Sequence, residues 1–308
     1  MSKVAVVTGA FSYTGKYVTR LLLARDWRVR TLTNHPDRDD PFFGTVQVFP
    51  YAFDRPDQLR AALEGATVLV NTYWIRFPHG RMTFDAAVRN SHALVDAARD
   101  AGVRQIVHVS IANPSRDSPL AYYRGKAEVE EIVASSSLAY TILRPAVIFG
   151  HEDILINNIA WFVRHVPVFV VPGDGRYALR PIYVEDMARL MAEAAEDREA
   201  SERVVNAVGP ETFGFEELVR RIAAQIGVRV RIAHAPAAVS YAGTRIAGWW
   251  LHDVVLTWEE CRGLMDNVLV VDGPSTGSTR LSHWLGNHRD DVGQHYASEL
   301  ARHYRAQG

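Results

Sequence analysis

Short apolar runs alternate with longer stretches in which apolar residues recur every three or four positions through the first half of the chain. Short runs rich in Val, Ile and Thr are typical of strands, and the second pattern is typical of helices. The pattern predicts strands at 3–8, 28–33, 46–50, 67–72, 105–110 and 139–143, and helices at 15–25, 57–63, 84–101 and 125–135. This alternation predicts an α/β fold with a doubly wound parallel sheet.

The alternation becomes irregular after residue 150. A Pro-Gly-Asp-Gly turn at 172–175 is followed by a predicted helix at 184–195, a strand at 203–208 and a helix at 215–226. We therefore expect a first domain at 1–150, whose sheet is completed by 178–208, and a smaller C-terminal lobe made of 151–177 and 209–308. The lobe's Trp249 and Trp258 are expected to pack in its core.

The first predicted strand is followed by the loop Thr-Gly-Ala-Phe-Ser-Tyr-Thr-Gly at 8–15. In units that bind a dinucleotide, the first glycine of such a loop makes the tight turn, the middle one admits the pyrophosphate, and the last lets the helix pack on the strand. Gly9 and Gly15 keep the outer roles, whereas Ser12 occupies the middle position with a hydroxyl that can donate to a phosphate oxygen. The same kind of loop also occurs without a nucleotide. The dinucleotide interpretation places these residues at the cofactor: Gly9, Phe11, Ser12, Tyr13, Thr14 and Gly15.

The end of the second predicted strand bears on the choice of dinucleotide. An acidic residue there binds the adenosine ribose hydroxyls and favours NAD. This strand instead ends in Asn34 and His35, with Arg38 close behind, and these side chains can accommodate a 2′-phosphate. We therefore expect NADP(H) to be favoured over NAD(H), although Arg38 in a polar loop can equally be a solvated surface residue.

Tyr122 and Lys126 stand four positions apart, so near a helix start they share one face. An ammonium beside a phenol favours the phenolate and lowers the phenol pKa from its usual ~10. Such a tyrosine can exchange a proton with a carbonyl or alcohol oxygen while hydride moves to or from a nicotinamide. Lys126 is one of only three lysines among 34 basic residues. The alternative is a packed ring and a solvated charge.

Composition narrows the class of protein. The chain has 34 basic and 35 acidic residues, a balance that favours neither nucleic acid nor an anionic membrane as a partner. One cysteine, Cys261, excludes an internal disulfide and favours a reducing compartment. A strand predicted within four residues of the start leaves no room for a signal peptide, and no apolar run approaches the ~20 residues that span a bilayer. We expect a cytoplasmic protein, and the scattered histidines predict no metal site.

Several motifs together resemble the short-chain dehydrogenase/reductase superfamily in its extended or atypical form. The resemblance is closest to the NmrA-like group and to the nucleotide-binding accessory subunit of respiratory complex I, and it spans residues 3–190. It rests on Thr8-Gly9 with Gly15, residues 97–103 and 106–110, Tyr122 with Lys126, Leu143-Arg144-Pro145 within 143–150, and residues 181–188. It implies a Rossmann-type fold whose smaller C-terminal lobe binds the substrate.

The resemblance also implies roles for individual residues. Tyr122 would be the acid/base, Lys126 would hold the nicotinamide ribose, and Ser110 would orient the substrate oxygen. Phe53 occupies the position at which the family usually has an acidic residue facing adenine. The remaining cofactor contacts that the resemblance implies come from Asn71, Thr72, Pro145 and Val147.

The fourth predicted strand is followed by an aromatic loop in which Tyr73, Trp74 and Phe77 are candidates for the wall of a substrate pocket. The combined interpretation is an NAD(P)-dependent oxidoreductase that acts on a carbonyl, alcohol or related group of an apolar or aromatic small organic substrate, with a homodimer as a candidate assembly. Two alternatives remain open: a non-catalytic NAD(P)-binding sensor or structural subunit, and a sugar-nucleotide epimerase or dehydratase.

Overall fold

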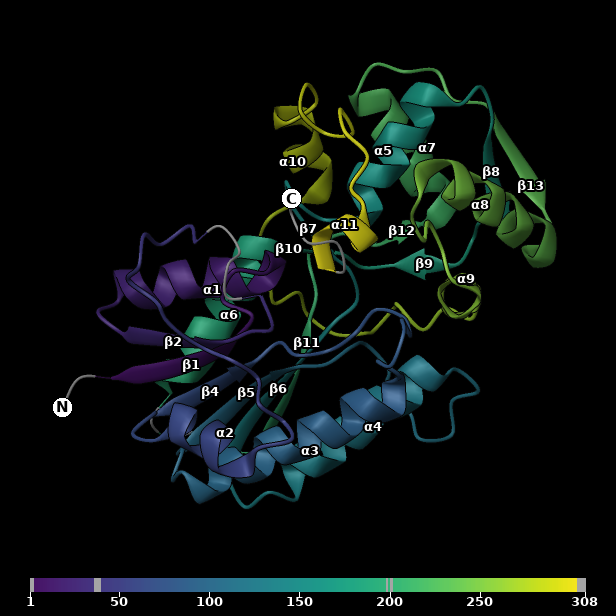
Figure 1. The fold of residues 1–308 in the computed structure, drawn as a ribbon. Coiled ribbons are helices and arrows are strands. Elements are labelled where there is room, and N and C mark those ends of the chain that lie inside the picture. Colours follow the sequence, from purple (N-terminus) through teal and green to yellow (C-terminus); the bar gives the residue numbers. More distant parts are fainter. Residues whose placement is uncertain (1–2, 36–39, 198, 200–201, 304–308) are drawn as a thin grey trace. The chain divides into compact units, whose positions relative to one another are not determined.

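A computed structural model of the 308-residue chain describes residues 3–35, 40–197, 199 and 202–303. The chain divides into two compact units (Figure 1). The first unit comprises Met1–Pro145 and Val184–Ala207, and the second comprises Ala146–Tyr183 and Val208–Gly308. The sequence placed the first boundary at residue 150 and gave residues 178–183 to the sheet, whereas the structure groups these residues with the second unit.

The first unit is built on a parallel sheet that has seven strands in the described part of the chain, in the order β11-β6-β5-β4-β1-β2-β3. Both faces of a parallel sheet are covered, and the fully buried Val-Ala-Val-Val-Thr run of the first strand fits that environment. The α/β class with a doubly wound parallel sheet is thereby confirmed. The strands are β1 (Val4–Thr8), β2 (Arg28–Leu32), β3 (Gln47–Phe49), β4 (Val68–Asn71), β5 (Gln105–Val109), β6 (Ala139–Pro145) and β11 (Arg203–Ala207).

Helices cover both faces of this sheet, as Figure 1 shows. The helices α1 (Tyr13–Ala24) and α6 (Val184–Glu196) pack together on one face. The helices α2 (Pro56–Leu63), α3 (Phe84–Asp100) and α4 (Ala121–Ala134) pack side by side on the other. The longest of them, α3, begins where the Thr83 hydroxyl accepts a hydrogen bond from the Ala86 N–H, and Gly102 follows its end with a φ of +73°.

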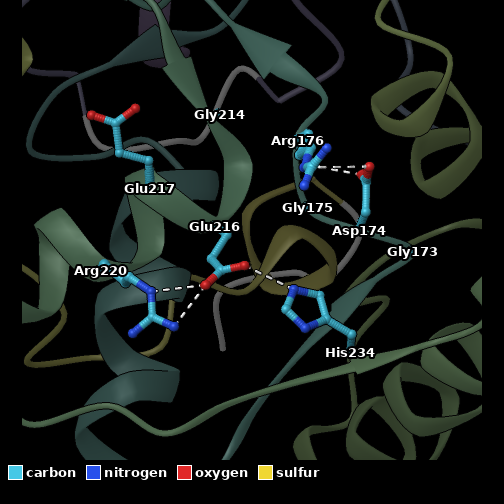
Figure 2. A pocket seen from close by; sticks show the side chains of 9 residues that line it. All are labelled: Gly173, Asp174, Gly175, Arg176, Gly214, Glu216, Glu217, Arg220 and His234. Carbon is cyan, nitrogen blue, oxygen red and sulfur yellow. Dashed lines mark hydrogen bonds and ion pairs between the residues drawn. The ribbon is translucent and has the colours of Figure 1, made fainter.

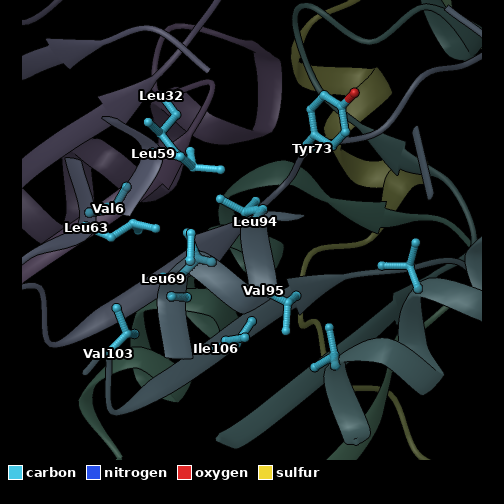
Figure 3. Close-up of a cluster of buried hydrophobic side chains, with 14 of the residues drawn as sticks. Val6, Leu32, Leu59, Leu63, Leu69, Tyr73, Leu94, Val95, Val103 and Ile106 are labelled. Carbon is cyan, nitrogen blue, oxygen red and sulfur yellow. The ribbon is translucent and has the colours of Figure 1, made fainter. Parts of the chain in front are cut away.

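The largest hydrophobic cluster lies between the sheet and the helices α2, α3 and α4 (Figure 3). Leu69 and Ile106 come from neighbouring central strands, and Leu63 and Leu94 come from helices that cover them; all four are fully buried. Burial of apolar area at about 25 cal/mol per Å² makes such a cluster the main stabilising contribution to the unit. Tyr73 also belongs to this cluster.

The second unit combines helices with short two-stranded pairings, β10 with β7, β12 with β9, and β13 with β8. Its helices α5 and α7 pack against each other. The strands are β7 (Ile148–Phe149), β8 (Phe169–Pro172), β9 (Ala178–Leu179), β10 (Ile182–Tyr183), β12 (Phe213–Gly214) and β13 (Ile232–Ala235). The helices are α5 (Leu155–His165), α7 (Phe215–Gln225), α8 (Ala237–Leu251), α9 (Trp258–Met265), α10 (Leu281–Asn287) and α11 (Glu299–His303).

Two expectations about local structure were wrong. The helix predicted to begin at Gly125 begins at Ala121, because the chain turns into the helix after Leu120 without a capping side chain that would mark the start. Trp249 was expected in the core of the lobe but is 82% exposed, and Trp258 is 41% exposed.

An ion pair with a buried carboxylate anchors α4 to the sheet. The Glu130 carboxylate, whose side chain is 9% exposed, accepts three hydrogen bonds from the Arg144 guanidinium on β6, and the Nε–Oε1 distance is 2.9 Å. The arginine of the Leu-Arg-Pro motif therefore fixes the helix that carries Tyr122 and Lys126.

We expect Arg144→Met to lower the free energy of unfolding at neutral pH by about 3 kcal/mol, because it leaves the Glu130 carboxylate buried without its partner. Urea titration measures the change. The double variant Glu130→Gln, Arg144→Met removes both charges and should regain at least half of the loss. A double variant as unstable as the single one would contradict the pairing.

Candidate functional site

The strand order reverses direction between β1 and β4, so the carboxyl ends of these neighbours form the switch point at which ligands bind in such sheets. Two hydrogen bonds join the ends: the Thr72 N–H donates to the Thr8 hydroxyl at 2.7 Å, and the Thr72 hydroxyl donates to the Thr8 carbonyl at 2.5 Å. Asn71 is fully buried, and its Oδ1 accepts hydrogen bonds from the Thr8 hydroxyl and the Tyr73 N–H. Asn71 and Thr72 therefore hold the two strand ends in register.

The turn between β1 and α1 depends on two glycines. Gly9 has a φ of +67°, a conformation that glycine adopts without strain. A Cβ at Gly15 would lie 2.0 Å from the Gly9 carbonyl oxygen, so a side chain there would overlap the backbone. The close approach of helix and strand that the sequence assigned to the outer glycines is present in the structure.

Ser12 is turned back into this loop. Its hydroxyl donates to the Gly9 carbonyl at 2.6 Å, and its N–H donates to the same oxygen at 2.8 Å. The hydroxyl proton that the sequence assigned to a phosphate is therefore used inside the turn. Ser12 does not cap α1, and the first turn of α1 has no acidic residue, so the positive end of the helix remains for an anion. Phe11 is buried, while Tyr13 and Thr14 begin the helix half-buried.

A pocket of about 460 Å³ lies at the carboxyl ends of β2 and β3. Its lining includes Asn34, Phe53, Arg55 and Asn90. The sequence identified Asn34 and Phe53 but missed Arg55 and Asn90. Arg55 directly precedes α2 at the carboxyl edge of the sheet, and that position was the available signal. His35 is exposed nearby along the chain, whereas Arg38 lies outside the described residues.

The Lys126 ammonium is buried at the start of α4. Its Nζ donates to the Val109 carbonyl at 3.0 Å and lies 4.9 Å from the centroid of the Trp74 ring. The residue is 3% exposed, and burial lowers its pKa to about 7, with the Glu130 carboxylate acting in the opposite direction. His108 is also buried, and burial, with a smaller contribution from the Lys126 charge, lowers its pKa well below the usual value.

Trp74 connects the lysine to the tyrosine. Its ring meets the Tyr122 ring edge-on at a centroid distance of 5.9 Å and stacks on Phe84 at 6.0 Å. A Cβ at Gly125 would lie 2.9 Å from the Trp74 Cη2 atom, so the glycine between Tyr122 and Lys126 makes room for this ring. The sequence singled out the two ends of this segment and missed the reason for the glycine.

Ser110 follows β5 directly and is 3% exposed. Its hydroxyl has no hydrogen-bond partner among the described residues, and the same holds for the indole N–H of Trp74. A buried polar group without a partner costs about 1–3 kcal/mol, so each of these groups is a candidate to bind a ligand. A hydroxyl without a partner is available for the role that the resemblance implies for Ser110, which is to orient the substrate oxygen.

The other residues predicted for the site are buried in, or hydrogen-bonded to, their own units. Tyr73 and Phe77 are 8% and 5% exposed, and the Tyr73 hydroxyl accepts a hydrogen bond from Asn90. The Pro145 carbonyl accepts from the Ala112 N–H, and Val147, in the second unit, accepts from the Ile182 N–H. Trp74, one of the three aromatic residues predicted to line a pocket, contacts both Tyr122 and Lys126.

The second unit contains a pocket of about 840 Å³ between the 173–175 turn, α7 and β13 (Figure 2). Its charged side chains neutralise one another: Glu216 is 2.6 Å from Arg220 and 2.8 Å from the His234 ring. The hydrogen bond from Arg220, followed by that from His234, lowers the pKa of Glu216.

Across the described residues, no helix is both long and apolar enough to cross a bilayer, and no three His, Cys, Asp or Glu side chains are grouped as metal ligands.

The glycine turn and the uncapped start of α1 can accommodate the pyrophosphate of a dinucleotide. Subunit 9 of the mitochondrial NADH dehydrogenase (ubiquinone) 1 alpha subcomplex from Arabidopsis thaliana is 29% identical over 226 residues, 70% of this chain and 56% of that protein. Its counterpart from Mus musculus is 27% identical, over 71% of this chain and 60% of that protein. This chain therefore spans less than two thirds of the length of these two relatives.

Solved structures share the fold over nearly the whole chain. An NADPH-dependent quinone oxidoreductase from Escherichia coli, complexed with NADPH, has a TM-score of 0.75 at 19% identity and covers 92% of this chain and 99% of its own. A nucleoside-diphosphate-sugar epimerase from Staphylococcus aureus has a TM-score of 0.76 at 15% identity and covers 93% of this chain and 100% of its own. At these identities the similarity shows a common Rossmann-type fold.

A family model described as NAD(P)H-binding matches residues 9–198, which begin at the first glycine of the turn and include the whole of α4. The resemblance expected from the motifs, and NAD(P)H as the class of cofactor, are thereby confirmed. The chain belongs to the NAD(P)H-binding family.

Proposed function

We propose that this protein is an NAD(P)H-dependent oxidoreductase that interconverts a carbonyl and an alcohol on an apolar or aromatic small organic substrate. The observation that carries the proposal is the joint placement of Tyr122 and Lys126 against one ring, Trp74, beside β5, whose following residue Ser110 has an orphaned hydroxyl. A tyrosine, a cation and a buried hydroxyl are the groups that reduction of a carbonyl requires from the protein.

In the reductive direction, a reduced nicotinamide, when bound, would supply the hydride that the carbonyl carbon of the substrate accepts. Tyr122 donates its phenolic proton to the carbonyl oxygen, so the carbonyl becomes an alcohol and the phenol becomes a phenolate. Lys126 stabilises that phenolate by its charge, and Ser110 donates a hydrogen bond that orients the oxygen. The phenolate then regains a proton from solvent, which returns Tyr122 to its starting state.

A second function is favoured by a specific observation. The curated relatives are subunits of a mitochondrial NADH dehydrogenase, and the Lys126 ammonium already donates to the Val109 carbonyl, a structural role that needs no substrate. A non-catalytic NAD(P)H-binding subunit would use the same turn and the same buried lysine. The two functions differ in whether the hydroxyl of Tyr122 matters for anything besides packing.

The pocket beside β2 and β3 supports NADP(H) over NAD(H). Asn34 stands where a carboxylate would favour NAD, and Arg55 brings a guanidinium to the same pocket. Arg55 pairs with Asp54 at 3.7 Å, but both side chains are largely exposed, and such pairs are worth only about 0–1 kcal/mol. A 2′-phosphate can therefore take the guanidinium from Asp54 at little cost.

We expect NADPH to bind at least tenfold more tightly than NADH, and we expect Arg55→Ala to remove most of this preference, a change of about 1.4 kcal/mol per tenfold. Calorimetric titration with both nucleotides measures it. The control is Arg60→Ala, since Arg60 lies on α2 outside the pocket and pairs with Glu64. Tighter binding of NADH by the parent protein would contradict the preference, and an unchanged ratio in Arg55→Ala would contradict the role of Arg55.

Tyr122→Phe keeps the ring that packs on Trp74 and removes the proton donor. We expect turnover of NADPH with quinone or aromatic aldehyde acceptors to fall by about 10²–10⁴-fold, while cofactor affinity and the melting temperature stay close to those of the parent. Tyr123→Phe, one position further along α4, is the matched control and should retain activity. Parent-like turnover in Tyr122→Phe would contradict the role of Tyr122 as proton donor, and a parent protein without turnover would favour the non-catalytic function.

The pKa of Lys126, about 7, makes cofactor binding sensitive to pH. Ribose hydroxyls beside the ammonium would stabilise its charge and raise this pKa, so binding at pH 7.5–8 should take up a proton. Uptake should vanish near pH 5.5, where the ammonium is already protonated. His108, the neighbouring titratable ring, has a pKa well below its usual value and stays neutral at pH 7.5–8.

Calorimetry in buffers of different ionisation enthalpy measures the uptake as a slope in the apparent binding enthalpy. Lys126→Met should abolish the slope, whereas Lys3→Met should retain it, since Lys3 pairs with Glu196 at the surface. A slope of zero in the parent protein at pH 7.5–8 would show that the cofactor does not stabilise the charge of Lys126.

A further inference from the structure

The helix α8 exposes an unusual amount of apolar surface. It contains one charged residue, Arg245, and its buried residues are Ser240 and Gly248. Val239 is 59% exposed, Ile246 and Trp250 are each 71% exposed, and Trp249 is 82% exposed. Helices that are apolar around most of their circumference are normally covered, so α8 has the composition of a buried helix in an exposed place.

Six of the eight exposed residues of α8 form one stripe along the helix, and the other two, Ala238 and Arg245, lie beside it. The six recur at three- and four-residue intervals, which places them on a single face: Val239, Ala242, Gly243, Ile246, Trp249 and Trp250. Arg245 immediately precedes Ile246 and is therefore rotated about 100° from it, at the flank of the stripe. The stripe itself carries no charge.

Gly243 lies in the middle of this stripe, and no contact in the described part of the chain requires a glycine there. Glycine destabilises a helix relative to alanine, so a glycine in a helix interior usually marks a close approach. At Gly248 that approach is internal, because a Cβ there would lie 2.6 Å from the Asp253 carbonyl oxygen. A Cβ at Gly243 would meet nothing within 4 Å in the described chain, so the gap faces outward.

We propose that α8 is a homodimer interface, in which it packs antiparallel against α8 of a second copy. A two-fold axis that passes between positions 244 and 245 sets Gly243 opposite Ile246 of the partner subunit and Val239 opposite Trp250 of the partner subunit. In these two pairs a smaller residue faces a larger one, and the symmetry repeats both contacts. The stripe is complementary to itself in this register.

The exposed area reaches the lower limit for a specific dimer interface. The four large side chains expose roughly 500–600 Å² per copy, given that an aromatic side chain presents about 150–250 Å². Two copies would bury roughly 1,000–1,200 Å², the lower limit for a specific protein–protein interface. The apolar character of the stripe is typical of homodimer interfaces.

Charge favours a second copy over a lipid surface. Helices that lie on membranes carry several Lys or Arg side chains on their polar face, whereas α8 has a single arginine, and the whole chain has 34 basic and 35 acidic residues. A protein with this balance gains little from an anionic bilayer.

Sedimentation equilibrium of the full chain tests the proposal, with a concentration-dependent dimer as the expected result. Ile246→Arg should yield a monomer with unchanged circular dichroism and an unchanged melting curve at low concentration. Phe43→Arg is the matched control, because Phe43 is 95% exposed and belongs to the first unit, and this variant should remain dimeric. A monomeric parent protein at 100 µM, a concentration chosen on the order of weak homodimer affinities, would overturn the proposal.

Gly243→Leu distinguishes a specific interface from nonspecific hydrophobic self-association. It adds apolar surface but fills the gap that receives Ile246, so the dimer should weaken by at least 100-fold. Stronger self-association of this variant, or flotation of the parent protein with vesicles of phosphatidylcholine and phosphatidylglycerol, would overturn the proposal.

Disulfide cross-linking tests the proposed antiparallel register, in which Gly243 lies opposite Ile246 of the partner subunit. Differently tagged Gly243→Cys and Ile246→Cys chains, mixed and oxidised, should form a heterodimeric disulfide, while the native Cys261 is buried and stays out of the reaction. Cross-links only between identical positions would overturn the antiparallel packing.

Discussion

The buried ammonium of Lys126 needs partners that offset the loss of its hydration, and several elements of the first unit supply them. A charge removed from water is tolerated only with close polar or opposite-charge partners. Its partners here are the Val109 carbonyl, the face of Trp74 and, at longer range, the Glu130 carboxylate. Glu130 is itself buried and pairs with Arg144, so the hydrogen bonds between this carboxylate and the guanidinium connect the compensation of the lysine charge on α4 to β6. The lysine is therefore held by α4, β5, β6 and the loop after β4 together.

That dependence connects the fold to the chemistry. A compensated but desolvated ammonium has a pKa close to neutrality, which places its charge under the control of whatever binds next to it. In the proposed function, the turn at Gly9 would supply the complementary part, because an uncapped helix start can attract the pyrophosphate of the same ligand. The two features lie at the carboxyl edge of one sheet, so a single extended dinucleotide can satisfy both.

The sequence predicted the regular part of this fold because buried strands have continuous apolar runs, and β1, β4 and β5 are such runs. It located Tyr122 and Lys126 by their spacing but misplaced the start of α4, because Leu120 is no capping residue. It missed Arg55, although the position of this residue directly before α2 was an available signal, because the strand ends that share the pocket are recognised only when the strands are placed side by side. Trp249 was assigned to the core because tryptophan is usually buried, and nothing local in a sequence distinguishes a helix that packs on its own chain from one left uncovered.

Two glycines inside helices, Gly15 and Gly125, lie where another group of the chain approaches the helix closely, and Gly243 differs from both. Gly15 admits the backbone of its own turn, since a Cβ there would overlap the Gly9 carbonyl. Gly125 admits a side chain, the ring of Trp74, and so brings an aromatic face onto the buried lysine. Gly243 has the same helical setting and the same cost to helix stability, yet the described chain offers nothing that approaches it. The proposed homodimer would bring the Ile246 side chain of a second copy to this position, so that Gly243 would also lie at a close approach.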